Sequence, residues 1–216
     1  MPGLGVQKIT EYAHQFCFGT KTGIDLPGEA DGFLPSKEWK EKTKGEPWFV
    51  GDTYHLSIGQ GDLLVTPIQM AVGTAMLANG GTRVQPTLLE KVNGKEVAPI
   101  FLESKKLIGK DWITIVRQGM RKAVTEGSAR ALNALSKPVA GKTGTAQVRR
   151  LQKQPDAAWH PFRDHAWFAG YAPAEDPRIA IVVLVEHGGK GGHVAAPIAA
   201  EIVEAIFDAE DGPVIP

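Results

Sequence analysis

The segment HAWFAGYAPAEDPRIAIVVLVEHGG, residues 165–189, decides the fold class. It holds two runs that are typical of β-strands, HAWFAGYAP at 165–173 and RIAIVVLVEHGG at 178–189, and the turn residues AEDP connect them. A parallel pair of strands needs a crossover of roughly a dozen residues or more. The short connection therefore predicts an antiparallel pair.

A third strand and a closing helix flank this pair. PVAGKTGTAQV at 138–148 is again typical of a strand, and VAAPIAAEIVEAIFDA at 194–209 has the spacing of an amphipathic helix. This order predicts an antiparallel sheet with helices packed on it. The predicted fold class is therefore α/β, of the α+β kind, with strands and closing helix at about 136–209 and a helical and loop part at about 1–135.

The helical part contains predicted helices at 5–19, 66–81 and 111–127. Gly19 is the predicted C′ residue of the first helix. Thr66 is the predicted N-cap of the second, with Pro67 at its first position, and Asp111 is the predicted cap of the third. The third helix is expected to bury one face, made of Ile113, Val116, Met120 and Val124.

The segments between these helices carry turn signals. Residues 20–62 contain turn dipeptides but no periodic run long enough for a core element, so we expect a long irregular connection there. Asn93-Gly94 lies between β-favouring flanks, which predicts a hairpin within 82–97. Residues 1–216 are expected to form one portion of a single domain.

Composition excludes several classes of protein. The chain has 216 residues, of which 43% are hydrophobic, so it can bury a sizeable core. The 24 basic and 24 acidic residues are dispersed, so neither nucleic acid nor an anionic membrane surface is expected as a partner. A single cysteine allows no internal disulfide. The longest aliphatic run is far shorter than the roughly 20 residues of a membrane helix, and no leader follows Met1, so we expect no targeting or anchor segment in this chain.

The triplet Lys-Thr-Gly occurs twice. Lys21-Thr22-Gly23 follows a predicted helix end, and a turn with a positive φ at Gly23 and two solvated polar neighbours explains it fully. Lys142-Thr143-Gly144 lies inside a predicted strand, where a glycine marks a bulge or a close approach by another backbone or a ligand.

The second triplet has the chemistry of an anion and peptide receptor. Lys142 and the hydroxyls of Thr143 and Thr145 suit a carboxylate, Gly144 gives clearance, and strand N–H groups suit a peptide or an oxyanion. The neighbouring sequence AGKTGT also resembles the end of a phosphate-binding loop. That motif needs a glycine where Ser136 stands and a helix after it, so we reject it.

Metal sites and aromatic ligand stacking are weaker hypotheses. His14 and Cys17 supply only two ligands, and His160, His165, His187 and His193 lack regular spacing. The segment EHGGKGGH, 186–193, is best explained as a glycine-rich connection between strand and helix. Trp167, Phe168 and Tyr171 are expected to pack in the core or at its rim rather than to stack on a ligand. No cofactor or metal is predicted.

Several segments together resemble class B penicillin-binding proteins. GKTGTAQV at 141–148 resembles the third catalytic motif of these serine acyltransferases, and four more segments match in the family's order: TGIDLPGE at 22–29, LSIGQGDLLVTPIQMA at 56–71, HAWFAGYAP at 165–173 and GGHVAAPIAAEI at 191–202. The match is best with the elongation-type branch, penicillin-binding protein 2. The resemblance places Lys142-Thr143-Gly144 in the family's site and Lys21-Thr22-Gly23 in a turn.

The resemblance implies peptidoglycan D,D-transpeptidation. A serine attacks the D-Ala-D-Ala carbonyl of a stem peptide, and the acyl group then passes to an amine on a neighbouring peptidoglycan strand. β-Lactams mimic the dipeptide. The resemblance implies that Lys142 sets the electrostatic field and the protonation state of the site. Thr143 and Thr145 would bind the carboxylate of the substrate or of penicillin, and the Thr145 N–H would be one donor to the oxyanion.

Two further family motifs are not found in the chain. None of its five serines is followed by lysine three places later or by asparagine two places later, so neither Ser-x-x-Lys nor Ser-x-Asn is present. Ser57, Gln60 and Gly61 match the family and could line the site, although turn geometry also explains them. We expect the C-terminal part of a transpeptidase domain, inactive alone, whose N-terminal part is its necessary partner.

The family also implies a location and a risk. The longer protein would work on the periplasmic face of the inner membrane, anchored there with other elongation proteins. The family sheet is five-stranded, and loss of its first two strands would leave 179–187 as a bare apolar edge prone to association. Two other hypotheses remain: a non-catalytic module that binds peptidoglycan or a partner, and a β-lactam-reactive hydrolase or sensor domain.

Overall fold

The computed structural model describes residues 3–102, 110–148 and 163–211. The chain divides into two compact units, which we call the N-terminal unit (Met1–Met76 and Thr82–Leu107) and the C-terminal unit (Leu77–Gly81 and Ile108–Pro216). The predicted division at about residue 135 followed the change from helices to strands. The two units follow packing instead. The helix at Lys110–Thr125 belongs to the C-terminal unit because it packs on the strand at Ala140–Ala146.

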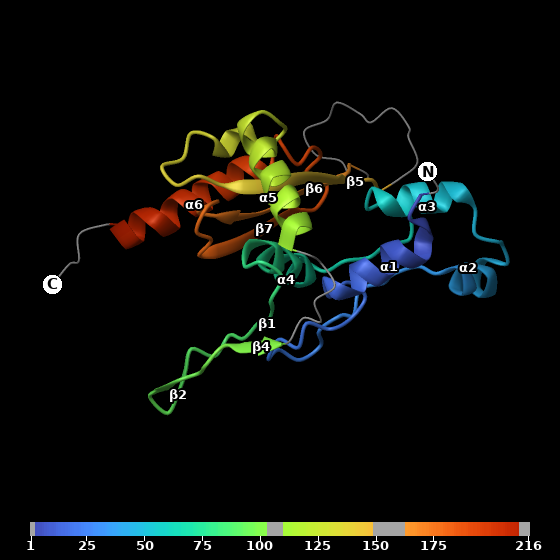
Figure 1. Ribbon diagram of the computed structural model, residues 1–216, viewed down its shortest axis with the longest axis horizontal. Helices are drawn as coiled ribbons and strands as arrows, with labels where there is room; N and C mark the ends of the chain where they lie inside the picture. The colour runs from blue at the N-terminus through green and yellow to red at the C-terminus, as the bar shows by residue number, and fades with distance from the viewer. Residues whose placement is uncertain (1–2, 103–109, 149–162, 212–216) are drawn as a thin grey trace. The chain divides into compact units, whose positions relative to one another are not determined.

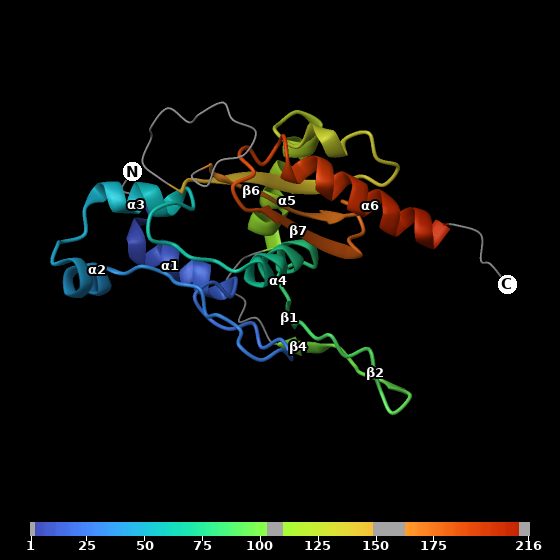
Figure 2. The same ribbon diagram turned by 180° about the vertical axis from the view of Figure 1, so that it is seen from behind.

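An antiparallel sheet organises the C-terminal unit. The strands β5 (Ala140–Ala146), β6 (His165–Ala172) and β7 (Ile179–Val185) lie in the order β5-β6-β7, and both neighbouring pairs are antiparallel. The helices α5 (Lys110–Thr125) and α6 (Ala195–Asp211) cover opposite faces of this sheet (Figures 1 and 2). The predicted sheet, its closing helix and the α+β fold class are confirmed.

The face covered by α6 holds the larger hydrophobic core. Small side chains let α6 approach the sheet closely, because Ala195, Ala196 and Ala199 are completely buried there. The short 3-10 helix η1 (Arg130–Leu132) closes one side of this core. Its buried members also include Val139, Ala166, Phe168, Ala172, Ile181, Val183, Val203 and Phe207.

The Phe168 ring lies across two glycines in this core. Gly141 of β5 pairs with Gly170 of β6, and Phe168 is completely buried beside them. A Cβ atom on either glycine would overlap the Phe168 ring. The two glycines therefore make the space that lets the ring lie on the sheet, as aromatic side chains do over strand glycines in designed sheets.

The face covered by α5 has a smaller core. Met120 of α5 packs with Ala140 of β5, Tyr171 of β6 and Ala78. The predicted burial of Ile113, Met120 and Val124 is confirmed, but Val116 is 45% exposed, because the residues turned toward the sheet include Arg117 and Arg121 instead. Asp111 stands in the first turn of α5 rather than at its cap, since the helix begins one residue earlier.

The N-terminal unit combines helices with two small pairs of strands. The helices are α1 (Gly5–Gln15), α2 (Lys37–Lys44), α3 (Val50–Ser57) and α4 (Pro67–Ala78), whose last two residues belong to the other unit. β1 (Arg83–Gln85) pairs with β4 (Ile100–Leu102), and β2 (Lys91–Val92) pairs with β3 (Lys95–Glu96). The predicted hairpin is confirmed, because Asn93 and Gly94 both have positive φ, as a two-residue hairpin turn requires.

The predicted start of α4 is confirmed by its hydrogen bonds. The Gln69 N–H donates to Thr66 Oγ1 (3.2 Å), and the Thr66 N–H donates to Gln69 Oε1 (2.9 Å), which is a reciprocal capping box. Gln69 is completely buried, and its Nε2 also donates to the carbonyl oxygens of Thr20 and Asp31, at 2.7 Å each. This side chain therefore fixes the irregular segment 20–31 to the helix.

The end of α1 differs from the prediction. The helix ends at Gln15, and Cys17, not Gly19, is the first left-handed residue, with φ +70°. The Phe18 N–H donates to the Ala13 carbonyl and the Cys17 N–H to the His14 carbonyl, which is the Schellman arrangement. Cys17 tolerates this conformation within a buried cluster with Val72 and Met76.

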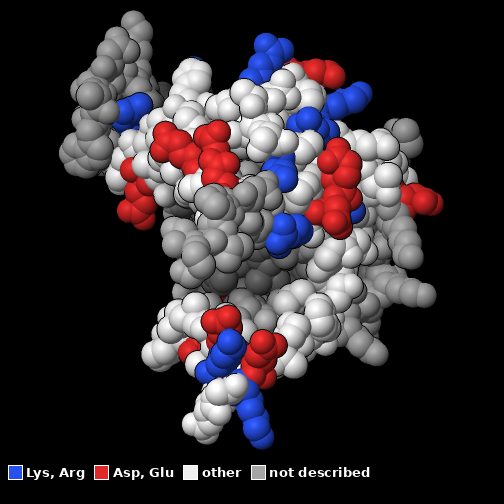
Figure 3. All heavy atoms as spheres, turned by 90° about the vertical axis from the view of Figure 1, so that its left-hand side faces the viewer, with Lys and Arg blue, Asp and Glu red and all other residues white. Residues whose placement is uncertain are grey.

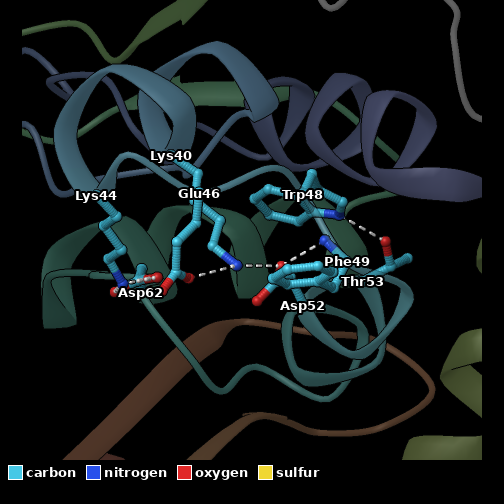
Figure 4. A network of polar contacts seen from close by, with 8 residues as sticks. All are labelled: Lys40, Lys44, Glu46, Trp48, Phe49, Asp52, Thr53 and Asp62. Carbon is cyan, nitrogen blue, oxygen red and sulfur yellow. Dashed lines mark hydrogen bonds and ion pairs between the residues drawn. The ribbon is translucent and has the colours of Figure 1, made fainter.

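The expectation of a purely irregular connection over 20–62 is wrong, because α2 and α3 lie within it. Ser36 Oγ accepts from the Trp39 N–H at the start of α2, and the left-handed Gly45 ends this helix. Lys40, only 5% exposed, donates to Asp52 Oδ2 at 2.6 Å and lies 4.5 Å from the Phe49 ring (Figure 4). Polar contacts rather than an apolar face thus connect the two short helices.

Charges of both signs mix on the surface. On the face drawn in Figure 3, Lys and Arg side chains alternate with Asp and Glu, and neither sign forms a broad patch. Within the described ranges, no helix combines the length and apolar character needed to cross a membrane.

Substitution of Gly141 should destabilise the protein. Gly141→Ala places a methyl group against the Phe168 ring and should cost about 1 to 3 kcal/mol of unfolding free energy, the usual range for overpacking. Gly119 in α5 is the matched control, because nothing lies within 4 Å of its Cβ position. Gly119→Ala should stabilise the helix by about 0.5 to 1 kcal/mol. Urea unfolding measures both, and equal effects would contradict the packing argument.

Loss of Lys40 should destabilise the protein in a pH-dependent way. The hydrogen bond from Lys40 lowers the pKa of Asp52, so the pair stabilises the fold above the unfolded carboxyl pKa of about 4 and loses its effect as the pH falls through the folded value. Lys40→Met should therefore lower Tm clearly at pH 7 and much less near pH 2 to 3.

The matched control for Lys40 is Lys44→Met. Lys44 forms an exposed pair with Asp62 at 2.7 Å, and exposed pairs contribute little to stability. Calorimetric melting of both variants over this pH range would refute the role of Lys40 if the two curves ran parallel.

Candidate functional site

The first triplet, Lys21-Thr22-Gly23, is part of a clamped turn. Gly23 has φ +86°, which confirms the predicted turn geometry. Thr22 is only 1% exposed, however, so the expectation of two solvated neighbours is wrong. Glu29 Oε1 accepts from the Thr22 N–H (2.7 Å) and hydroxyl (2.6 Å), and Glu29 Oε2 accepts from the Gly23 N–H (3.1 Å). Burial acts to raise the pKa of Glu29, but these hydrogen bonds outweigh it and lower the pKa. This triplet is structural.

The second triplet lies on β5, an edge strand of the sheet that the described residues form. Side chains alternate between the two faces of a strand. Thr143 pairs with Phe168 and Thr145 with Ala166, so both threonines lie on the α6 face. Lys142 and Gly144 lie on the opposite face with Ala140, where α5 packs. The predicted receptor residues are therefore divided between two faces of one strand.

Thr143 is held inside the protein. It is 8% exposed, and its Oγ1 lies 2.5 Å from Ser128 Oγ, with either hydroxyl able to donate. Ser128 follows α5 and had no predicted role. Its contact with Thr143 could not be predicted from local sequence, because fifteen residues separate the two. The expected carboxylate binding by Thr143 stays a prediction, and any such ligand competes with this short hydrogen bond.

Lys142 is exposed on β5, and its Nζ donates to the Thr143 carbonyl oxygen at 2.5 Å. That bond is formed within the strand, so the ammonium group stays close to the backbone of the triplet. An ammonium has three donors, and the remaining ones can serve an anionic ligand. The geometry agrees with a cation at the edge of a peptide-binding strand.

A glycine loop supports the triplet from the α6 face. The Gly191 N–H donates to Thr145 Oγ1 at 3.4 Å. A Cβ atom on Gly191 would overlap the carbonyl oxygens of Gly144 and Trp167, so only glycine allows this approach. The predicted role of 186–193 as a connection between strand and helix is confirmed. Its contact with the triplet was not predicted.

Gly144 also has a packing reason. Its Cβ position lies 3.1 Å from Trp167 Cβ, which is tighter than ordinary contact. The predicted clearance for a ligand therefore coincides with a requirement of strand pairing, because Gly144 and Trp167 are direct partners in the register. Phe168 and Tyr171 are completely buried, so the expectation of core packing for these two aromatics is confirmed.

Other candidate residues lie elsewhere. Ser57 and Gly61 belong to the N-terminal unit, where Ser57 Oγ donates to the Tyr54 carbonyl and Gly61 has φ +82°, as a turn requires. Cys17 is buried, and no cluster of three or more His, Cys, Asp or Glu that could hold a metal occurs within the described part of the chain. His160 lies outside the described residues. The His187 N–H donates to His165 Nδ1 at 2.9 Å, which is a contact between neighbouring strand ends.

A family model described as the penicillin binding protein transpeptidase domain matches residues 3–204. The chain is similar to the peptidoglycan D,D-transpeptidase MrdA of Acinetobacter baumannii, with 36% identity over 214 residues, which is 95% of this chain and 31% of that protein. The chain spans about a third of the length of the curated relatives it matches.

The fold is also similar to that of solved structures, of which two are examples. Pseudomonas aeruginosa PBP2 in complex with WCK 5153 aligns with a TM-score of 0.78 and 38% identity over 94% of this chain and 43% of that one. Helicobacter pylori PBP2 in complex with MreC aligns with a TM-score of 0.81 and 30% identity over 95% of this chain and 36% of that one.

The two threonines of the site should differ in their effect on stability. Thr143→Val removes a buried hydroxyl and its hydrogen bond with Ser128, which is exposed and can bond to water instead, so the loss should be about 0.5 to 1.5 kcal/mol. Thr145 is exposed and its hydrogen bond with Gly191 is long, so Thr145→Val should cost less than about 0.5 kcal/mol. Denaturant unfolding of the two isosteric variants tests this order, and a larger loss for Thr145→Val would show that the Thr143–Ser128 hydrogen bond contributes less to stability than the contact of Thr145 with Gly191.

Proposed function

Because the chain belongs to the family of penicillin-binding protein transpeptidase domains, with relatives of the PBP2 type, we propose that it is the C-terminal part of a peptidoglycan D,D-transpeptidase domain. The observation that carries this proposal is the exposed Lys142 on the edge strand β5, backed by the glycine loop at Gly191. The predicted resemblance is confirmed at the level of the family. The activity of the longer protein is part of the proposal.

In the proposed reaction, a serine outside this chain adds to the carbonyl carbon of the D-Ala-D-Ala bond of a stem peptide. The terminal D-Ala leaves with the serine's proton, and an amine of a second stem peptide then displaces the serine from the acyl-enzyme. β5 would receive the substrate as an added strand along its free edge. The Thr145 N–H would be one donor to the developing oxyanion.

The side chains of the triplet take unequal parts in this proposal. Lys142 would supply positive charge and help to set protonation in the site. Thr145 is exposed and suits a substrate or β-lactam carboxylate better than Thr143, whose hydroxyl faces Ser128. Gly144 would leave room beside the strand.

We propose that the chain alone forms no acyl-enzyme. None of its serines has lysine three places later, so the family's nucleophile would come from an N-terminal part of the domain. Loss of a serine nucleophile costs about six orders of magnitude in kcat in a serine protease, a scale that leaves no useful turnover. The longer protein would work on the periplasmic face of the inner membrane, with partners such as the MreC seen with Helicobacter pylori PBP2.

Labelling with a fluorescent penicillin tests the proposal on the full-length protein. Lys142→Ala should lower the rate of acylation by about 100-fold or more, because it removes a preorganised charge from the site. Lys21→Ala is the matched control, since it alters the same residue type in the structural triplet and should keep the rate within about twofold.

Three outcomes separate the hypotheses. The chain expressed alone should remain unlabelled. Labelling of the chain alone would disprove the need for an external nucleophile. Equal loss in Lys21→Ala and Lys142→Ala would remove Lys142 from the site, and substrate binding by a full-length protein that is never labelled would favour the non-catalytic binding module.

A further inference from the structure

A pocket with a volume of about 280 Å³ lies between α5 and the sheet of the C-terminal unit. Its lining includes Ala140 and Tyr171, which are partners at the beginning of β5 and the end of β6. None of residues 142–145 lines it. The mechanism proposed above gives the pocket no role.

Two arginines one helical turn apart give the pocket its charge. Arg117 Nη2 donates to the Ala174 carbonyl at 3.1 Å, and Arg121 Nη1 donates to the Val139 carbonyl at 2.9 Å. Each guanidinium has five N–H donors, so each keeps several after this bond. Neither arginine has a carboxylate within ion-pair distance among the described residues. The backbone carbonyls thus fix two guanidinium groups without neutralising them.

Tyr171 adds a buried hydroxyl beside Arg117. The residue is completely buried, its hydroxyl has no partner at full hydrogen-bond geometry among the described residues, and the Arg117 guanidinium lies close enough to interact with it. Arg117 lies 5.5 Å from the centre of its ring, which leaves the guanidinium over the ring face. Burial raises the pKa of Tyr171 against the opposing effect of Arg117, so the hydroxyl keeps its proton and can donate at neutral pH. Buried hydroxyls rarely remain unpartnered in folded proteins.

The other polar lining residues leave the pocket open to a ligand. Gln118 of α5 is exposed and can donate or accept. Glu175 is the only acidic lining residue and is also exposed. Two positive charges therefore face one solvated negative charge.

We propose that this pocket binds a carboxylate group, held by Arg117, Arg121 and the Tyr171 hydroxyl. Planar guanidinium groups match the two oxygens of a carboxylate, and charge-assisted bonds of this kind are strong. The volume lies just below the range of about 300 to 1,000 Å³ typical of drug-sized ligands. A single acidic side chain or a small organic acid fits it.

The carboxylate can come from a free acid or from a polypeptide, and one experiment on the full-length protein separates them. Sodium succinate is titrated against sodium chloride at constant ionic strength, and Tm is followed by calorimetry. A free-acid site should give a saturable rise in Tm. Arg117→Gln and Arg121→Gln should weaken the apparent affinity by at least about tenfold.

Two further variants test the role of charge: Glu175→Gln removes the acidic lining residue, and Arg130→Gln is the matched control. Removal of the like charge in Glu175→Gln should tighten succinate binding. Arg130 is an exposed arginine outside the pocket whose Nη2 also donates to a backbone carbonyl, that of Glu126, so Arg130→Gln should leave the affinity unchanged. An equal loss in Arg130→Gln would mean that succinate acts through general surface charge, which would overturn the free-acid site.

Tyr171→Phe identifies the polypeptide alternative. If an acidic side chain of the protein fills the pocket, succinate has no effect and Tyr171→Phe lowers Tm, because a real hydrogen bond is lost. If the site takes a free acid, Tyr171→Phe without succinate leaves Tm unchanged or raises it, and binding weakens. The proposal is overturned if succinate gives no saturable effect and Tyr171→Phe does not lower Tm.

Discussion

The contact of the Phe168 ring with Gly141 and Gly170 is the constraint on which the C-terminal unit depends. The ring occupies the space that two side chains would otherwise fill, and it joins the strand pair to the core beneath α6. Lys142 follows Gly141 directly, so the position of the site on β5 is set by this contact. The candidate site is therefore built on a closely packed pair of strands.

The alternation of β5 explains how so short a motif can serve both structure and ligand. One face carries Lys142 and Gly144, and the other carries Thr143 and Thr145 against Ser128 and Gly191. A strand cannot present neighbouring side chains to the same side. The buried Thr143 holds the strand against its core, and the exposed Lys142, the exposed Thr145 and the free edge remain available for a ligand.

Local signals predicted the elements that local physics determines. Three features were predictable because each depends on residues close in sequence. They are the Asn93-Gly94 turn, the capping box of Thr66 and Gln69, and the three strands of the sheet. α2 and α3 escaped prediction because a buried Lys40 ion pair, not an apolar stripe, holds them.

The burial of Thr22 and of Thr143 also escaped prediction, although for different reasons. Thr22 is covered through Glu29, seven residues on, and Thr143 through Ser128, fifteen residues back. The Gly191 contact adds a mechanical consequence. An outward shift of β5 toward an arriving ligand would separate Gly144 from the loop that precedes α6, so this strand resists movement, and any adaptation to ligands of different shape has to come from the groups that face it.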